Sequence, residues 1–318
     1  MKRIFWGDIH FVHATVLRDG RALVVAGPNA ALFETLEPLE IAAPPRRRGW
    51  RVLVATSDGN ALVIDGGKKA DKLRKCERFD ALTATWSPGP DMHIERSYFG
   101  AVALDDRVLV IGRGPTESLR TGARSWELEP LPELEGDWFA ATAVSKRSVL
   151  VGSTLGTWLW TLESNGTWRV DAGPERSRAT LVALRDGGAL VCGGLDEVRV
   201  DRLGADGTWT RLPDLPESRA NAVGLELEDG RVLLAGGSGT REVSEDDSDG
   251  GQLDLEYRTV GEVRWVPKLI ELQDAAVAAS AGAEWKTKYL AEKVEKGFRF
   301  GSGVLFVHNW SALWWDGS

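Results

Sequence analysis

The chain has 318 residues, 43% of them hydrophobic and 27% charged, which is typical of a globular protein and excludes a wholly disordered one. A formal net charge of −8 without a basic stripe argues against nucleic acid as a partner. No apolar run reaches the roughly 20 residues that span a bilayer, and none near the start has the length of a signal peptide. We therefore expect a cytoplasmic protein without a membrane partner. Frequent Ala and an excess of Arg over Lys are typical of a bacterial source.

In chain order, the first recurring pattern is a polar turn followed by an apolar run that ends near glycine. Copies lie at residues 19–27, 58–67, 105–112, 147–152, 186–194 and 229–237. Four copies begin with Asp-Gly, a pair that favours hairpin turns because it tolerates positive φ. The apolar run predicts a strand buried on both faces. A double glycine at its end lets the backbone turn where side chains would collide.

A second marker has the same period. Trp86, Trp126, Trp168 and Trp209 lie 40 to 42 residues apart, and Trp265 continues the series after a longer interval. We expect each tryptophan to lie on the fourth strand of its unit and to pack between neighbouring units, because one sheet cannot bury both of its faces alone. Four-stranded units of about 40–45 residues predict a β-propeller.

Two segments interrupt the period. Residues 238–256 are an acidic insertion rich in Gly and Ser, and the run 245–251 lacks the ligand spacing of a calcium loop. Residues 275–296 show no strand alternation, and their composition favours a helical insertion.

These units resemble kelch repeats. The resemblance rests on the double glycine, on the tryptophan near the end of each unit and on the link Leu-Pro-x-Leu-Pro-x-x-Arg at 212–219, and it covers about residues 10 to 266. It implies an all-β fold, with one β-propeller domain of four-stranded kelch-like blades over residues 1–318. A seventh unit at 303–316 lacks a fourth strand, which residues 4–6 are suited to supply. We predict seven blades with the N-terminal strand closing the last, and six as the alternative.

Kelch-like propellers include two enzyme types, a copper galactose oxidase type and a sialic-acid mutarotase type. The oxidase type needs a Tyr–Cys crosslink and paired Tyr and His copper ligands. The tyrosines here are Tyr98, Tyr257 and Tyr289, and no Cys or His is placed to complete that set, which argues against the oxidase type. The two cysteines, Cys76 and Cys192, lie in different units and indicate a reducing compartment. A mutarotase needs only a few acid–base and Arg groups around the central mouth, so that alternative stays open.

The histidines do not form a metal motif. No pair among them has ligand spacing with cysteines or carboxylates. The four residues are His10, His13, His93 and His308. We predict no metal, no cofactor and no catalytic residues.

Candidate binding residues lie in the links that lead into the first strand of each unit. In a propeller these links gather on one face around the central channel, and Arg and aromatic side chains are enriched at interface hot spots. The partner-binding candidates are Arg47, Arg48, Trp50, Arg96, Tyr98, Trp138, Arg178, Arg219 and Asn221. The alternative for the same residues is a structural role between blades. Trp158 and Trp160 share one face of a strand, which suggests a lateral contact surface or burial against a neighbouring blade.

The leading hypothesis is a non-enzymatic binding module or scaffold that docks another protein on the propeller mouth and the inserted loops. The first alternative is a small-molecule or carbohydrate-active propeller, mutarotase-like, with its ligand in the central pocket. The second alternative is a structural subunit of a larger complex that uses Trp158 and Trp160.

Overall fold

The structure is a computed structural model. It describes residues 2–5, 12–26, 29–34, 38–45, 51–66, 74–226, 230, 232–235, 238–241, 262–265, 268–272, 285–289, 296–300, 303–308 and 311–315. Within these ranges the regular elements are strands, and no helix is long and apolar enough to cross a membrane.

The described residues form seven four-stranded antiparallel sheets, numbered here in chain order. Sheet 1 contains β2 (Val12–Val16), β3 (Ala22–Ala26), β4 (Asn29–Phe33) and β5 (Pro38–Ile41). Sheet 2 contains β6 (Arg51–Ala55), β7 (Ala61–Asp65), β8 (Cys76–Asp80) and β9 (Thr85–Pro88). Sheet 3 contains β10 (Gly100–Ala103), β11 (Arg107–Ile111), β12 (Glu117–Arg120) and β13 (Glu127–Leu128).

The later sheets follow the same plan. Sheet 4 contains β14 (Ala140–Ser145), β15 (Ser148–Gly152), β16 (Thr157–Leu162) and β17 (Trp168–Ala172). Sheet 5 contains β18 (Thr180–Ala183), β19 (Ala189–Gly194), β20 (Glu197–Leu203) and β21 (Trp209–Leu212). Sheet 6 contains β22 (Val223–Glu226), β23 (Val232–Ala235), β26 (Lys268–Leu272) and β27 (Trp285–Tyr289). Sheet 7 contains β28 (Lys296–Phe300), β29 (Gly303–His308), β30 (Ser311–Trp315) and β1 (Lys2–Phe5).

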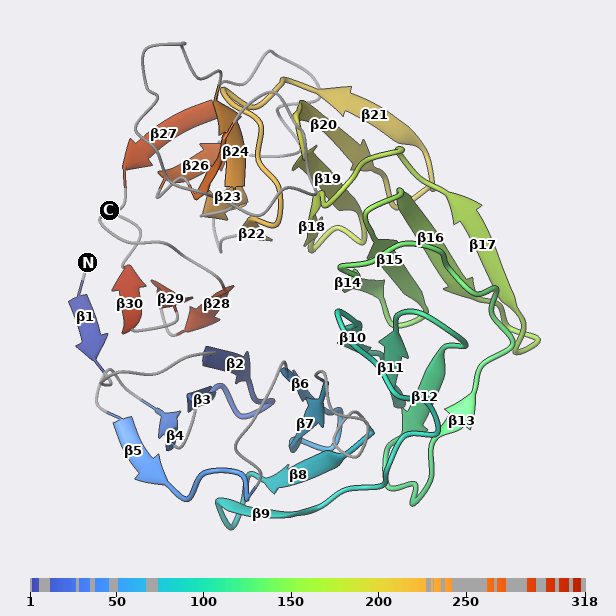
Figure 1. Cartoon of the computed structure of the whole chain (residues 1–318), viewed down its shortest axis with the longest axis vertical. Coiled ribbons are helices and arrows are strands. Elements are labelled where there is room, and N and C mark those ends of the chain that lie inside the picture. Colours follow the sequence, from blue (N-terminus) through green and yellow to red (C-terminus); the bar gives the residue numbers. More distant parts are fainter. Residues whose placement is uncertain are drawn as a thin grey trace.

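The sheets are arranged in a ring, with the first strand of each nearest the centre (Figure 1). These inner strands contact one another in a closed cycle, β2–β6–β10–β14–β18–β22–β28 and back to β2. The last sheet joins both ends of the chain, because β1 pairs with β30 in a register that places Lys2 opposite Trp314 and Phe5 opposite Ser311. The sequence predicted this pairing. It matters because a ring closed in this way leaves few strand edges open.

The second strands of sheets 2, 3 and 5 are buried along their whole length, as their apolar runs predict. They pack in clusters that join neighbouring sheets. One such cluster unites Val102 and Leu109 of sheet 3 with Val149, Val151 and the fully buried Trp160 of sheet 4. The core therefore lies between the sheets, and the second strands bury apolar residues on both faces, while the buried charges at their ends, Asp65 and Arg107, are paired with Arg51 and Glu129.

The periodic tryptophans link each sheet to the one before it. The indole nitrogen of Trp86 donates to the carbonyl of Ala42 at 2.7 Å, and that of Trp126 donates to the carbonyl of Pro90 at 2.9 Å. Trp209 packs against the buried cluster of sheets 4 and 5. The 40-residue period of tryptophan therefore reflects a repeated contact between sheets.

The double glycine of sheet 5 is required by a close approach. The amide of Gly194 donates to the carbonyl of Arg219 at 2.9 Å, and Gly193 and Gly194 have φ of 58° and 146°. A Cβ on Gly193 would lie 2.8 Å from the carbonyl oxygen of Arg219. Only glycine permits this approach without displacing the next link.

Two expectations need correction, one about the helical insertion and one about Trp265. Trp285–Tyr289 lies inside the predicted helical insertion at 275–296 but forms β27, whose alternating aromatic and Thr residues suit a strand. Residues 275–284 and 290–295 lie outside the described residues. Trp265 does not lie on the outer strand of sheet 6; it belongs to β25 (Glu262–Trp265), which pairs with β24 (Ser238–Arg241) in a separate two-stranded ribbon. The remainder of the acidic insertion, 242–256, is also outside the described residues.

Candidate binding face at the mouth of the ring

Four equivalent residues stand at the mouth of the ring, each two positions before the first strand of its sheet. They precede β10, β14, β18 and β22 and have φ between 51° and 58°. They are Tyr98, Trp138, Arg178 and Asn221. This left-handed conformation suits Gly or Asn and costs about 1–2 kcal/mol for other residues. Asn221 is thus the expected residue type, whereas two aromatic residues and an arginine occupy the other three positions.

The links that carry these residues are bonded to one another. The amide of Phe139 donates to the carbonyl of Tyr98, and the amide of Asn221 donates to the carbonyl of Arg178, both at 2.9 Å. Because the backbone of each link is held by its neighbour, the side chains project from a layer with defined positions.

The side chains of three mouth residues form a stack. The rings of Tyr98 and Trp138 lie 4.6 Å apart between centroids with an interplanar angle of 29°. The guanidinium carbon of Arg178 lies 5.4 Å from the centroid of the Trp138 ring, within the range of a cation–π contact. Tyr98 comes from the link before sheet 3, Trp138 from the link before sheet 4 and Arg178 from the link before sheet 5, so the stack crosses three sheets.

An exposed leucine extends this surface. Leu155, in the turn between β15 and β16, is 58% exposed, and Trp138 is 36% exposed. A Cβ on Gly136 would lie 3.3 Å from Cγ of Leu155, and the amide of Thr154 donates to the carbonyl of Asp137 at 3.0 Å. Leu155 is therefore held beside the link that carries Trp138. We call Tyr98, Trp138, Leu155 and Arg178 the mouth patch.

Two predicted partner-binding arginines are buried instead. Arg96 is 2% exposed and donates to Glu117 at 3.3 Å and to the carbonyl of Arg113 at 3.2 Å. Arg219 is fully buried and pairs with Glu217. Burial lowers the pKa of both guanidinium groups, and the neighbouring carboxylates oppose that effect. The expectation that Arg96 and Arg219 contact a partner is therefore wrong, because their charges are matched inside the protein.

Three exposed carboxylates lie on the links that carry the mouth patch. Glu95, Glu135 and Glu175 each lie three residues before a mouth residue, and all three are exposed. We call them the acidic rim. None of them makes an ion pair with another described residue. Their spacing of 40 residues places one on each link before sheets 3, 4 and 5.

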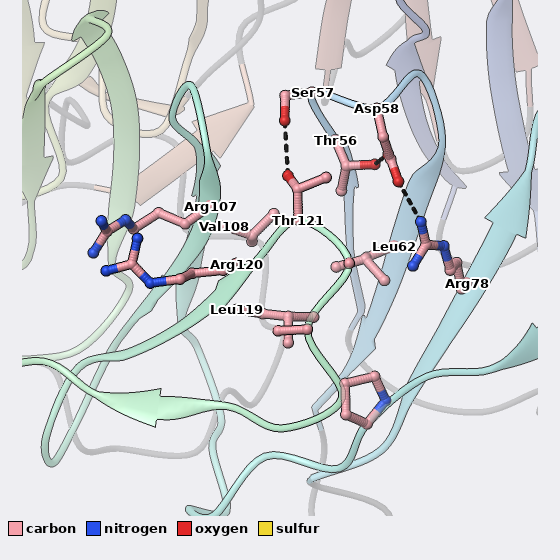
Figure 2. A pocket seen from close by; sticks show the side chains of 13 residues that line it. Thr56, Ser57, Asp58, Leu62, Arg78, Arg107, Val108, Leu119, Arg120 and Thr121 are labelled. Carbon is pink, nitrogen blue, oxygen red and sulfur yellow. Dashed lines mark hydrogen bonds and ion pairs between the residues drawn. The ribbon is translucent and has the colours of Figure 1, made fainter.

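The opposite face carries a second, different concentration of polar groups. It is built from the turns that follow the first strands, whereas the mouth links precede those strands. Figure 2 shows a pocket between sheets 2 and 3, where the hydroxyls of Ser57 and Thr121 lie 2.8 Å apart and Asp58 pairs with Arg78. Leu62, Val108 and Leu119 contribute apolar lining beside these polar groups.

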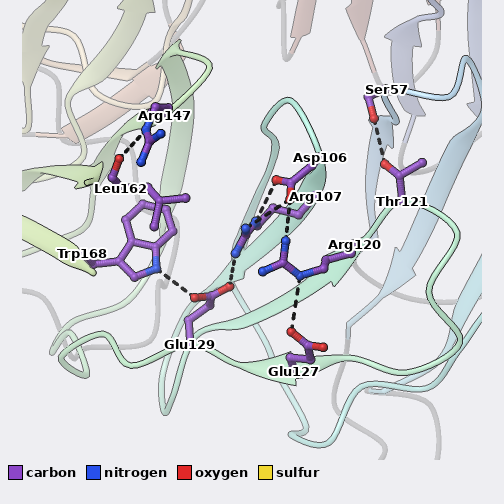
Figure 3. A network of polar contacts seen from close by, with 10 residues as sticks. All are labelled: Ser57, Asp106, Arg107, Arg120, Thr121, Glu127, Glu129, Arg147, Leu162 and Trp168. Atoms are coloured by element: carbon purple, nitrogen blue, oxygen red, sulfur yellow. Dashed lines mark hydrogen bonds and ion pairs between the residues drawn. The ribbon is translucent and has the colours of Figure 1, made fainter. Parts of the chain in front are cut away.

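A polar network continues from this pocket to sheet 4 (Figure 3). Glu129 accepts hydrogen bonds from Nη1 of Arg107 at 2.9 Å and from the indole of Trp168 at 2.8 Å. Burial acts to raise the pKa of Glu129, but the hydrogen bonds from Trp168 and Arg107 help to lower it below its ordinary value. Asp106 pairs with both Arg107 and Arg120. Because the arginines and carboxylates drawn here satisfy one another, this network joins sheets rather than offering a free charge to a ligand.

The proposed lateral surface is not exposed. Trp160 is fully buried and Trp158 is half-buried, and both pack in the cluster between sheets 3 and 4. The prediction of a lateral contact through these two residues is wrong, because the neighbouring sheet already covers them. Three further candidates, Arg47, Arg48 and Trp50, lie outside the described residues.

The described residues contain no group of three or more His, Cys, Asp and Glu side chains placed to hold a metal ion. His93 lies beside the buried Glu117, with Nδ1 3.0 Å from a carboxylate oxygen. Glu117 also accepts hydrogen bonds from the amides of His93 and Ile94. This carboxylate therefore anchors the link that leads to Tyr98.

Tyr98, Trp138, Arg178 and Asn221 were among the candidates that the sequence offered, whereas Leu155 and the acidic rim were not. The regular 40-residue spacing of Glu95, Glu135 and Glu175 was the signal that could have revealed the rim. Leu155 had no comparable signal, because a single leucine in a turn resembles any other exposed apolar residue.

Comparison with known proteins bears on the fold. No protein-family model matches the chain, and no curated protein matches its sequence. A solved fungal alcohol oxidase of the AA5 family, described in complex with copper, is similar with a TM-score of 0.58 at 18% identity over 72% of this chain. The alignment spans 58% of the length of that oxidase chain. YjhT is similar with a TM-score of 0.54 at 12% identity, over 96% of this chain and 93% of its own. Likeness at these identities shows the fold alone, and this chain is an all-β propeller.

Proposed function

We propose that this chain is a propeller of kelch type that acts as a binding module, with the mouth patch as the docking site for another protein. The periodic tryptophans between sheets and the Gly193–Gly194 pair support the kelch assignment. The binding proposal rests on the mouth patch itself.

The observation that carries the proposal is the choice of residues at the left-handed mouth positions. Tyr98, Trp138 and Arg178 occupy a conformation that disfavours them, and their side chains gather in one stack. The scaffold itself does not need these side chains, because Asn221 serves at the equivalent position of sheet 6. Tyr, Trp and Arg are the residue types that contribute most at protein interfaces.

The test compares partner capture by the wild type with capture by the double variant Trp138→Ala, Leu155→Ser. Crosslinking in a lysate of the source organism, followed by mass spectrometry, identifies the bound proteins. We expect a protein that the wild type captures and the mouth variant does not. A matched control is Leu39→Ser, Leu128→Ser, which also removes two exposed apolar side chains, both away from the mouth.

Thermal unfolding of all three proteins is measured first, so that loss of a partner is not confused with loss of fold. A partner retained by the mouth variant, or lost equally from the control, would contradict a docking role for the mouth patch. Absence of any protein captured by the wild type would contradict the binding proposal itself.

A second candidate function is the binding of a carbohydrate or another small polar molecule. The stacked rings of Tyr98 and Trp138, with Arg178 and the acidic rim beside them, offer an aromatic platform flanked by hydrogen-bonding groups. A mutarotase-like activity would place acid–base groups at this platform. A thermal-shift screen with sugars and sugar acids tests it, and a saturable shift that Trp138→Ala abolishes is the expected result.

A further inference from the structure

Resting on the proposed function, we infer that the protein segment that docks on the mouth patch is basic, with Lys or Arg side chains that meet the acidic rim and an apolar side chain that covers Trp138 and Leu155.

The three links that carry the mouth patch leave negative charge exposed. Glu95, Glu135 and Glu175 present three carboxylates to solvent, and none forms an ion pair with another described residue. The one guanidinium of the mouth patch, on Arg178, is engaged with the Trp138 ring. The mouth patch and the rim together therefore carry a formal charge of about −2, which favours a cationic partner.

Two other arginines of these links do not neutralise the rim. Arg96 and Arg176 follow Glu95 and Glu175 directly in sequence, yet their side chains are buried. Arg96 pairs with Glu117, and Arg176 pairs with Asp201. Glu95 and Glu175 are exposed while the arginine that follows each of them is buried, so neighbouring residues of these links face opposite environments.

Two exposed arginines near this face are already paired. Arg113 lies 2.8 Å from Asp137, and Arg199 lies 2.6 Å from Glu197. These pairs use carboxylates other than those of the rim. These two arginines are therefore not the counter-ions of the rim.

The ring of Trp138 is compatible with a neighbouring cation. Its ring already has the guanidinium of Arg178 at 5.4 Å from the centroid. A partner that carries an aliphatic or aromatic side chain next to Lys or Arg would bury the exposed part of Trp138 and of Leu155 while its charge reaches the rim. Such a segment needs only a short extended stretch, because the patch spans three neighbouring links.

The experiment selects short random peptides on phage against the whole protein and measures the affinity of the enriched sequences by fluorescence anisotropy. We expect peptides of net positive charge with an apolar anchor, whose affinity falls at least about tenfold from low to high salt. The rim variant Glu95→Lys, Glu135→Lys, Glu175→Lys should lower the affinity of these peptides by a similar factor. A control variant changes the net charge by the same amount at exposed sites away from the mouth: Glu40→Lys, Asp105→Lys, Glu127→Lys. It should lower the affinity of the peptides by less than about twofold.

The outcomes separate this inference from the proposed function. Enriched peptides that are neutral or acidic but lose binding in Trp138→Ala would overturn the basic partner and leave the mouth patch as a docking site. Peptides that bind Trp138→Ala as well as wild type would overturn the docking site. Basic peptides that respond equally to the rim variant and the control would show that only net charge attracts them, and that result would also overturn the inference. A selection that enriches no peptide would count against both.

Discussion

The indole of Trp168 donates a hydrogen bond to the carboxylate of Glu129 across the boundary between sheets 4 and 3, at 2.8 Å. Arg107 binds the other oxygen of the same carboxylate at 2.9 Å. One acidic group thus joins a tryptophan of one sheet to an arginine of the sheet before it. Similar links by Trp86 and Trp126 use backbone carbonyls, so Glu129 is the member of the series that responds to pH.

Stability should therefore depend on the protonation of Glu129. The pKa of this carboxyl in the folded protein lies below its ordinary value. The ionised carboxylate therefore contributes its full stabilisation above the pKa of about 4.3 that Glu has in the unfolded chain. This stabilisation is lost as pH falls through the lower pKa of the folded protein. Urea denaturation of wild type and Glu129→Gln measures the effect. We expect the difference in their free energies of unfolding to shrink on acidification below about pH 4, and a constant difference would show that the carboxylate charge contributes nothing.

Trp126→Phe should destabilise the protein by about 1–3 kcal/mol, because it removes buried volume and leaves the carbonyl of Pro90 without its donor. Trp126 is almost fully buried and its hydrogen bond measures 2.9 Å. Trp86→Phe is the comparison, since Trp86 makes the same kind of bond but is only half-buried. Chemical denaturation should show the larger loss for Trp126, and the reverse order would refute burial as the cause.

The inner strands of sheets 3 and 4 leave no room for a methyl group at Gly100. A Cβ there would lie 3.2 Å from backbone atoms of Phe139, Ala140 and Ala141. We expect Gly100→Ala to cost about 1–3 kcal/mol through displacement of the adjacent strand. Gly156→Ala is the control, because its Cβ would meet the Trp158 ring at an ordinary 3.8 Å. Equal melting temperatures for the two variants would show that the inner strands move apart freely.

Arg96 should prove structural. Arg96→Met leaves the buried carboxylate of Glu117 without its guanidinium, and we expect a loss of about 2–4 kcal/mol in the free energy of unfolding. Arg113→Met removes an arginine that is 70% exposed and should cost less than about 1 kcal/mol. Thermal or urea unfolding distinguishes them. A folded Arg96→Met of unchanged stability would return Arg96 to the set of partner-binding candidates.

Trp138→Asn should change stability by less than about 1 kcal/mol, because the loss of the stack is offset by relief of a left-handed conformation that Asn tolerates. Trp160 lies in the core between sheets 3 and 4, and Trp160→Asn should lower the free energy of unfolding by about 3–5 kcal/mol. Denaturation curves measure both. A large loss in Trp138→Asn would mean that the mouth stack holds the sheets together rather than awaiting a partner.

The sequence alone predicted the repeated unit, the buried second strands, the tryptophan contacts between sheets and the pairing of the N-terminal strand with the last sheet. These features are local or periodic, so composition and spacing carry them. The prediction from sequence was wrong at Trp285–Tyr289. The composition of the longer segment favoured a helix, although these five residues form a strand. Strand pairing with β26, a tertiary contact, decides that element.

Only the tertiary structure determines which side chains of the links are buried and which face the mouth. Arg96 and Tyr98 lie two positions apart in one link, and the sequence offered both as binding residues. Arg96 turns inward because Glu117 and backbone carbonyls receive its charge there, whereas Tyr98 turns to the mouth because the left-handed backbone directs it toward Trp138. Burial depends on which partners the neighbouring sheets supply, and spacing within one link does not contain that information. The sequence determined where each link lies on the ring, and the packing of one sheet on the next decided which side chains remain available.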